Sequence, residues 1–146
     1  MEKIIPLSSE NIAQFVPLYR SVFNSPPWND GWSDTAVAER LAAFAACPNF
    51  HGFGLTHAGE SMGLVFGQGE RWVNGWTFHI KELCVHAAVQ RQGQGKKLML
   101  AFEAHLQQLG FLGADLQTAD AAPARLFYEG LGYKSSGLVS LYRKFA

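Results

Sequence analysis

The chain has 146 residues, a length that allows one domain with a sizeable core and no disulfide or metal staple. Apolar residues make up 48% of it and aromatic residues 13%, which predicts a globular fold rather than a disordered chain. Twelve basic and twelve acidic residues give a formal net charge of zero, so no global positive field exists to attract nucleic acid. We expect one domain over residues 1–146, with any anion recognition confined to a local site.

The cysteines, the histidines and the apolar runs indicate where the protein is located and which partners it lacks. Cys47 and Cys84 are far apart and form no CxxC motif, which favours reduced thiols in a cytoplasmic protein. No apolar run approaches the roughly 20 residues that span a bilayer, and the first residues do not resemble a signal peptide. The five histidines lack the spacing of a zinc site. The sequence thus predicts a cytoplasmic protein with no metal, no membrane partner and no nucleic acid.

The first part of the chain predicts one strand and two helices. Residues 3–7 are typical of a strand, and apolar residues then recur at helical spacing over 12–23, where Pro17 indicates a kink or a late helix start. Residues 24–32 are a loop rich in Pro, Asn, Asp and Gly. A second helix is expected over 33–47, capped by a serine or aspartate and ended by Pro-Asn.

The middle of the chain turns to strand patterns. Residues 50–57 and 62–66 predict a hairpin, and a glycine-rich turn over 67–75 leads to a long central strand at 76–85. Leucines and a phenylalanine over residues 98–109 then fall on one face of a helix.

The last part predicts a strand at 111–118, a short helix opened by Pro123, and a final strand at 139–145. The order is one strand, two helices, three strands, helix, strand, helix, strand. It predicts an α/β fold with a mixed sheet flanked by about four helices, rather than a doubly wound parallel sheet.

Residues 90–97, Gln-Arg-Gln-Gly-Gln-Gly-Lys-Lys, are the most informative stretch. They lie between a strand and a helix, and two alternate glycines allow a tight turn with no Cβ to block a close ligand. The amides that open a helix lack partners inside it and lie at the positive end of its dipole. Together with Arg91, Lys96 and Lys97, this backbone predicts a loop that binds a phosphate group.

Two familiar glycine loops do not fit these residues. A P-loop needs a glycine five residues before its Gly-Lys pair and a Ser or Thr after the lysine, but Gln90 and Lys97 hold those places. A dinucleotide fingerprint starting at Gly93 would need a small residue where Leu98 stands, and an acidic residue ending the next strand.

The pattern that fits is Gln-x-x-Gly-x-Gly at residues 90–95, preceded by Glu-Leu-Cys-Val at 82–85. It resembles the acetyl-CoA loop of the GNAT superfamily of N-acetyltransferases. A second block, Leu-Phe-Tyr-Glu-Gly-Leu-Gly-Tyr at 126–133, is similar to that family's Phe-Tyr-Glu-Lys-Leu-Gly-Phe segment. The resemblance spans nearly the whole chain. It implies a mixed, mostly antiparallel sheet whose strands splay at the cofactor site.

The resemblance also implies how acetyl-CoA would bind as a co-substrate. Its pyrophosphate would rest on the backbone of residues 91–96, and its pantetheine arm would follow the strand end at 83–85, where the amide of Val85 is the expected oxyanion donor. The cofactor contacts expected are Leu83, Cys84, Val85, Gln90, Arg91, Gln92, Gly93, Gln94, Gly95 and Lys96. One departure is Ala121-Ala122, where family members often carry an asparagine that touches the cofactor, so that contact must be missing or replaced.

Two residues are candidates for catalysis. Tyr128 is the expected general acid, because its phenol stays protonated at neutral pH and can donate to a departing thiolate. The alternative is that Tyr128 only packs. Glu82 is the expected base, since an alkyl amine is almost entirely protonated at pH 7 and must lose a proton before it attacks. A water relay or a plain surface role for Glu82 stays open, and Asp120 is a weaker candidate.

The loop at 24–32 is the candidate acceptor site. Trp28 and Trp32, with Asp30 and Asp34 nearby, would form an aromatic, mildly acidic wall for a cationic amine. The alternative is that the tryptophans anchor the loop over the sheet and that the acids are helix-cap or surface residues.

The sequence thus predicts an N-acetyltransferase that moves an acetyl group from acetyl-CoA to a primary amine of a small molecule, by direct attack in a ternary complex. A peptide amine stays open as the acceptor. One alternative is an aminoglycoside-type antibiotic acetyltransferase, suggested by the aromatic, acidic loop. Another is a non-catalytic acyl-CoA-binding module, kept open by Ala121-Ala122. A homodimer is a further expectation, because many relatives dimerise.

Overall fold

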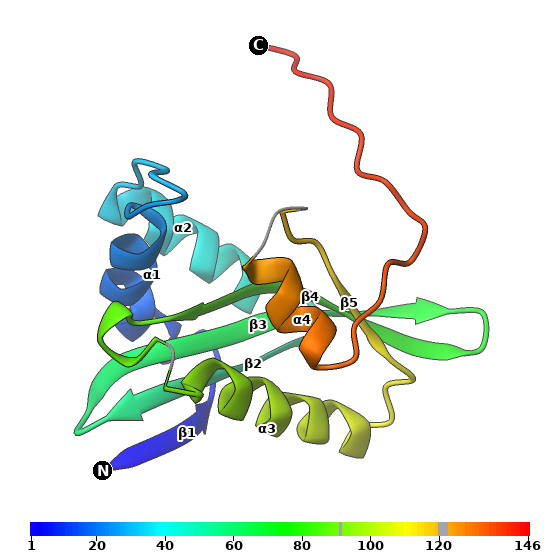
Figure 1. The fold of residues 1–146 in the computed structure, drawn as a ribbon, viewed down its shortest axis with the longest axis horizontal. Coiled ribbons are helices and arrows are strands. Elements are labelled where there is room, and N and C mark those ends of the chain that lie inside the picture. The colour runs from blue at the N-terminus through cyan, green and yellow to red at the C-terminus, as the bar shows by residue number, and fades with distance from the viewer. Residues whose placement is uncertain (91, 120–122) are drawn as a thin grey trace.

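A five-stranded sheet forms the centre of the fold, with its strands in the order β1-β2-β3-β4-β5 (Figure 1). The computed structural model describes residues 1–90, 92–119 and 123–146. The strands are β1 (Glu2–Pro6), β2 (Phe50–His57), β3 (Glu60–Trp72), β4 (Gly75–Val85) and β5 (Ala114–Leu116). Neighbours from β1 to β4 are antiparallel, and β5 pairs parallel with β4. The predicted mixed, mostly antiparallel sheet is therefore confirmed.

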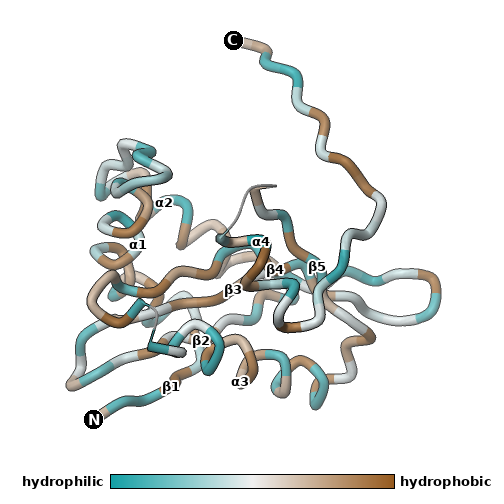
Figure 2. Tube along the Cα trace, in the orientation of Figure 1, coloured by the Kyte–Doolittle hydropathy of each residue, from teal (hydrophilic) through white to brown (hydrophobic). Residues whose placement is uncertain are grey.

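Helices cover both faces of this sheet (Figure 1). They are α1 (Val16–Phe23), α2 (Asp34–Ala45), α3 (Gln94–Gln108) and α4 (Ala124–Gly130), with the 3-10 helices η1 (Ile12–Phe15) and η2 (Ala87–Val89). One core cluster lies between the sheet and α1 and α2, and a second lies between the sheet and α3, with α4 at its border. Figure 2 shows the hydrophobic residues of the central strands that these helices cover. No helix in the described part of the chain is both long and apolar enough to cross a bilayer.

Local signals place the first two helices as predicted. Pro17 stands in the first turn of α1, where a missing N–H costs nothing, so the α-helix starts late, after η1. Ser33 caps α2, because its hydroxyl accepts a hydrogen bond from the amide of Ala36 at 3.1 Å.

A β-bulge in β4 decides which face the site residues occupy. Phe66 of β3 is opposite Glu82, but Gly67 is opposite Ile80, so Lys81 is an extra residue. Ile80 packs in the cluster under α3, whereas Cys84 packs in the cluster under α1 and α2. The sequence analysis did not predict this bulge.

The predicted glycine-rich turn at 67–75 is wrong over most of its length. β3 continues through these glycines to Trp72 and pairs with β4 from Gly63 onward. A Cβ on Gly67 would lie 1.8 Å from the carbonyl oxygen of His79. The glycine therefore permits close approach of two strands, which is a common role of glycine inside a strand.

The sheet splays between β4 and β5. Their ladder covers three residues of each strand, from Phe78 opposite Ala114 to Ile80 opposite Leu116. The remaining residues of β4, 81–85, continue without β5 beside them. The splay expected from the resemblance is present.

Three further boundaries differ from the predictions. α3 starts at Gln94 rather than at Leu98, because the helix begins directly after the glycine turn. β5 is shorter than the predicted 111–118, since the splay ends its pairing. The predicted strand at 139–145 is wrong for the described chain: residues 134–146 form an extended, exposed arm that projects from the domain (Figure 1). A strand requires a partner, and this arm has none among the described residues.

Candidate active site

The glycine loop joins β4 to α3 and presents the start of that helix. The side chain of Gln90 donates a hydrogen bond to the carbonyl oxygen of Val85 at 2.9 Å, which fixes the loop against the strand end. Gly93 is the N-cap of α3 with a left-handed φ of 77°, and no side chain caps the helix there. The first turn of α3 contains no acidic residue. Its free amides and positive dipole end therefore suit an anion.

The surroundings of the two loop glycines fit a bound pyrophosphate and pantetheine. No atom lies within 4 Å of a Cβ placed on Gly93, and a Cβ on Gly95 would meet Phe127 and Val85 at 3.6 Å. Gly93 thus leaves open space beside the loop, and Gly95 allows Val85 of β4 and Phe127 of α4 to lie close to the helix start. Lys97 forms an ion pair with Glu2 of β1, so the exposed Lys96 is the lysine left to approach a phosphate.

The end of β4 directs a backbone amide into the splay. The amide of His86 donates to the carbonyl oxygen of Met62 on β3 at 2.7 Å. Peptide groups alternate in an antiparallel ladder, so those of Val85 point away from β3, as the bond from Gln90 to the Val85 oxygen also indicates. The N–H of Val85 therefore faces the gap that β5 leaves, which is the place expected for an oxyanion donor. Cys84 is buried on the face of the sheet that α1 and α2 cover, so its thiol is part of the core.

Glu82 lies on that same face, between the sheet and the first two helices. Its side chain is 16% exposed, and one of its carboxylate oxygens lies 3.6 Å from the guanidinium of Arg40 on α2. The other oxygen is buried and has no hydrogen-bond partner among the described residues. Tyr19 of α1 also interacts with this carboxylate.

The neighbours of Glu82 oppose one another in their effect on its protonation. Burial raises the pKa of Glu82 above the usual range of a glutamate. Polar interactions with Tyr19 and Arg40 lower the pKa, and the negative charge of Asp30 raises it again. The net direction is upward, which suits a carboxylate that accepts a proton near neutral pH.

Tyr128 lies on α4, on the other side of the splay from Glu82. Its ring packs against Phe127 and Tyr133, with ring centroids 5.2 and 6.0 Å away. Burial first, and then the negative charge of Glu82, raise the pKa of Tyr128 to about 12. The phenol therefore stays protonated at neutral pH and serves as a hydrogen-bond donor.

Tyr128 and Glu82 line one open cavity of about 1310 Å³, although they come from opposite faces of the sheet. The splay connects the two faces at this point. The structure thus brings the two predicted catalytic residues together.

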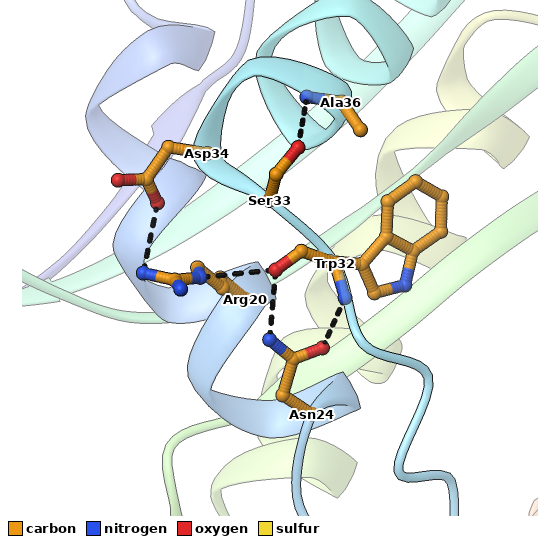
Figure 3. Close-up of polar contacts among 6 residues, drawn as sticks. All are labelled: Arg20, Asn24, Trp32, Ser33, Asp34 and Ala36. Carbon is orange, nitrogen blue, oxygen red and sulfur yellow. Dashed lines mark hydrogen bonds and ion pairs between the residues drawn. The ribbon is translucent and has the colours of Figure 1, made fainter.

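The predicted acceptor loop is fixed by hydrogen bonds at its end (Figure 3). The side-chain amide of Asn24 accepts from the backbone N–H of Trp32 at 2.6 Å and donates to its carbonyl oxygen at 2.9 Å. Arg20 donates to the same carbonyl oxygen at 3.0 Å and lies 3.4 Å from Asp34. Asp34 therefore has the structural role that the sequence analysis gave as the alternative.

Of the remaining loop residues, Trp32 and Asp30 lie near Glu82, whereas Trp28 packs elsewhere. Trp32 packs edge-on against Tyr19 at 5.5 Å and lies 5.9 Å from the guanidinium of Arg40, so it is close to Glu82. Its indole N–H donates to Asp30 at 3.1 Å. Trp28 instead packs against Phe23 of α1 and is 47% exposed.

Two residues beside Glu82 were missed by the sequence analysis. Arg40 lies on α2 at the spacing of the apolar residues Val37, Leu41 and Phe44, where a charged side chain is unusual. A charged residue at that position was a signal from which a role at the site could have been predicted. Tyr19 had no such signal, because it belongs to the apolar stripe of its helix and is 2% exposed.

A second polar group lies farther along the same face and was also missed. The imidazole of His79 on β4 is 2.6 Å from Asp115 of β5 and 2.5 Å from Glu70 of β3. Burial lowers the pKa of His79, but its hydrogen bonds to the two carboxylates outweigh burial and raise it.

Four of the site predictions, for Arg91, Asp120, Ala121 and Ala122, lie outside the described residues.

The sheet splays beside a glycine loop that leads into an uncapped helix start, an arrangement suited to an anionic cofactor at the end of the central strand. The model of the acetyltransferase (GNAT) domain family matches residues 48–135, which include β2 to β5, the glycine loop and α4. The chain therefore belongs to the GNAT acetyltransferase family. The predicted class of enzyme, an acetyl-CoA-dependent N-acetyltransferase, is thereby confirmed.

Solved structures share this fold over almost the whole chain. An aminoglycoside acetyltransferase from an uncultured soil metagenomic sample, in complex with sisomicin, has 22% identity and a TM-score of 0.79, covering 99% of this chain and 97% of that one. The aminoglycoside N-acetyltransferase AAC(6')-Iy, in complex with CoA, has 16% identity and a TM-score of 0.77, covering 100% and 96%.

A ribosomal-protein-alanine N-acetyltransferase from Brucella melitensis biovar Abortus 2308 has 16% identity and a TM-score of 0.76, covering 99% of this chain and 100% of that one. These identities are low, so the likeness establishes the fold. A comparison with functionally curated proteins found no matching sequence.

Proposed function

We propose that this protein transfers the acetyl group of acetyl-CoA to a primary amine of a small molecule by direct attack in a ternary complex, with Glu82 as the base and Tyr128 as the acid. The observation that supports this assignment is the placement of the two side chains. They line one cavity at the splay of the sheet. The glycine loop lies near Tyr128, since a Cβ on Gly95 would meet the neighbouring Phe127 at 3.6 Å.

Glu82 prepares the amine in this proposal. An alkyl amine arrives as an ammonium ion, and the unpartnered oxygen of Glu82 is available to accept its proton, directly or through a water. Arg40 and Tyr19 position the carboxylate, since both interact with it from helices on its own face of the sheet. Acetyl-CoA supplies an activated acetyl thioester.

Tyr128 assists the departure of the thiol in this proposal. Its phenol is protonated at neutral pH and lies across the splay from Glu82, on the α4 side. A donor at that position can hydrogen-bond to the leaving sulfur and give it a proton. The backbone N–H of Val85 is the expected donor to the acetyl oxygen.

The acceptor is the least defined part of the proposal. Trp32, Asp30 and Glu82 form an aromatic and acidic wall, which suits a cationic amine. The aminoglycoside alternative gains support from the neighbours that are named aminoglycoside acetyltransferases. A peptide acceptor has the support of one neighbour, named a ribosomal-protein-alanine N-acetyltransferase. Trp28, which packs against Phe23 of α1, has the weakest support as a substrate contact.

Several sequence-based expectations stay predictions. They are a single domain over residues 1–146, a cytoplasmic location, a homodimer, no metal, and no nucleic-acid or membrane partner. Both cysteines, Cys47 and Cys84, are free thiols.

A screen of amines tests the proposal. We expect the protein to release CoA from acetyl-CoA in the presence of at least one compound among polyamines, amino acids and aminoglycosides. A protein that binds CoA, measured by calorimetry, but releases none with any amine would instead be the non-catalytic acyl-CoA-binding module.

A further inference from the structure

Arg40 is a charged side chain of the cavity wall whose hydrogen-bond donors are not used by the described residues. It lies on α2 and lines the cavity together with Glu82. Its Nη2 atom is 3.6 Å from a carboxylate oxygen of Glu82, an ion-pair distance that is too long for a hydrogen bond. Its Nε atom is buried and has no hydrogen-bond partner among the described residues. Such a donor calls for an explanation, because native proteins rarely leave a buried donor unsatisfied.

Arg20 shows how an arginine with a structural role is bonded in the same region (Figure 3). Its Nε donates to the carbonyl oxygen of Trp32 at 3.0 Å, and its guanidinium lies 3.4 Å from Asp34. Arg40 has no contact as short as these to a polar atom of the described residues. Aromatic rings fix its position instead, because its guanidinium carbon lies 5.0 Å from the ring centroid of Phe44 and 5.9 Å from that of Trp32. The Arg40 side chain is 33% exposed, so a ligand in the cavity can reach it.

The unpartnered atoms of Arg40 and Glu82 are complementary to each other. The second carboxylate oxygen of Glu82 is buried and also lacks a hydrogen-bond partner among the described residues. The pair therefore offers a negatively charged acceptor and positively charged donors side by side. An ammonium group matches the carboxylate of Glu82. A carboxylate matches the guanidinium, which can bind it through two parallel N–H donors. A ligand that carries both groups would satisfy both side chains.

The charges of the whole cavity also favour such a zwitterion over a polycation. Among the described residues that line it, the four basic ones, Arg40, Lys81, Arg125 and Lys134, are equal in number to the acidic ones. A site for a polyamine or an aminoglycoside needs an acidic excess, because each ammonium group of the ligand has to be compensated. Arg40 also places a positive charge beside the proposed base, where it would repel further ammonium groups.

We propose that the acceptor is an α-amino acid, whose carboxylate binds Arg40 while its ammonium group binds Glu82. In an α-amino acid the two groups are attached to the same carbon atom, which suits partners as close as these two side chains. Arg40 thereby determines the specificity for the acceptor, in addition to positioning the carboxylate of Glu82.

The reaction is that of the proposed function, on which this inference rests. The nitrogen of the amino acid loses one proton to Glu82 before it attacks, and a second one after its bond to the acetyl carbon has formed. The carbon–sulfur bond breaks with its electron pair on sulfur, which takes the proton of Tyr128. The second proton from nitrogen restores Tyr128 through water, and Glu82 releases its proton to the solvent.

Acceptors that differ only in the carboxylate test the proposal. Leucine, phenylalanine and lysine are each compared with the amine that lacks the carboxylate: 3-methylbutylamine, phenethylamine and cadaverine. We expect wild type to favour the amino acid of at least one pair by about tenfold or more in kcat/KM, because its partner loses a charge-assisted hydrogen bond. The difference should lie mainly in KM.

Variants of Arg40 assign the preference to this side chain. Arg40→Met should abolish it, because methionine fills the space beside Trp32 and Phe44 without a charge. Arg40→Lys should recover part of it, since lysine restores the charge but not the paired donors. The ratio of two acceptors within one variant cancels the common effect of Arg40 on Glu82. Arg71→Met, at the exposed end of β3, is the control and should keep the wild-type ratio.

Calorimetry with CoA present distinguishes a failure of this inference from a failure of the proposed function. Wild type should bind at least one of the three amino acids, and Arg40→Met should bind it about tenfold more weakly or worse, whether or not acetyl transfer occurs. The inference would be overturned by an unchanged preference in Arg40→Met, by a preference for the simple amine in every pair, or by the absence of amino acid binding. Acetylation of the simple amines alone would leave the proposed function in place. Amino acid binding that depends on Arg40, without release of CoA from acetyl-CoA, would overturn the proposed function and support this inference.

Discussion

At the residue scale, Glu82 is held between opposing effects. Burial favours its protonated form, and Arg40 and Tyr19 favour the carboxylate. A base must be ionised to accept a proton, so activity should fall as the pH falls through the pKa of Glu82. The position of this acid limb therefore reports the surroundings of the carboxylate.

Replacing Arg40 tests that balance. Arg40→Met keeps an apolar side chain beside Trp32 and Phe44 but removes the charge that lowers the pKa of Glu82. The pKa should rise, and the acid limb of kcat/KM against pH should move to higher pH. Arg71→Met, at the exposed end of β3, is the control and should leave the limb in place. An unmoved limb in Arg40→Met would show that Glu82 is not the group that titrates.

Tyr128 and its neighbour Tyr133 form a matched pair. Both rings pack in the cluster under α3, but the Tyr133 hydroxyl already has a partner, because it donates to Glu103 at 2.6 Å. Tyr128→Phe should lower turnover by about 10²-fold or more, with CoA affinity nearly unchanged. Tyr133→Phe should lower the free energy of unfolding by about 1 kcal/mol and leave turnover intact. Equal turnover in wild type and Tyr128→Phe would assign Tyr128 to packing.

At the element scale, a substitution at the start of α3 can distinguish an effect on cofactor binding from an effect on folding. Gly93→Val would alter both, because a β-branched residue is strained at its left-handed φ of 77° whether or not a ligand is present. Gly95 has no such constraint, and a methyl group there would make ordinary contacts with Phe127 and Val85 at 3.6 Å.

We therefore expect Gly95→Ala to keep or raise the free energy of unfolding, since alanine favours a helix by up to about 1 kcal/mol over glycine. The added methyl stands between β4 and α4, where the pantetheine arm is proposed to run. CoA affinity, measured by calorimetry, should fall by about tenfold or more. Unchanged affinity in this folded variant would place the cofactor elsewhere.

The loop at 24–32 depends on Asn24, which forms two hydrogen bonds to the backbone of Trp32 (Figure 3). Asn24→Ala should lower the free energy of unfolding by about 1–3 kcal/mol, from two lost bonds. It should also raise the KM of the acceptor amine more than that of acetyl-CoA. Ser33→Ala, which loses one cap bond of similar worth but not the loop anchor, is the control. Equal effects on both KM values would argue against an acceptor role for the loop.

Local chemistry made much of this site predictable. Glycine, a basic flank and a following helix are contiguous in sequence, so the loop at 90–97 could be placed without a structure. The same holds for Pro17 and Ser33, which act on their own helices. The predicted strand at 139–145 is wrong because a strand depends on a partner, and none of the residues that the structure describes pairs with the arm.

At the scale of the whole molecule, the site depends on contacts between distant segments. Arg40, Tyr19 and Glu82 come from three elements, and Glu82 meets them because the bulge at Lys81 changes the facing of β4. Sequence patterns along one element do not show such register shifts. The splay of β5 then joins two faces that would otherwise be separated by the sheet, which is how Tyr128 of α4 reaches the same cavity.

The central claim is that Glu82 removes a proton from the amine before acetyl transfer, and the ratio of wild-type to Glu82→Gln turnover across pH tests it most directly. Near pH 7 the amine is almost wholly protonated, so the variant should be slower by about 10²-fold or more. As the pH approaches the pKa of the amine, the neutral form becomes abundant, and the ratio should shrink toward one. A ratio that stays constant over the whole range, or equals one at pH 7, would contradict a role for Glu82 as the base.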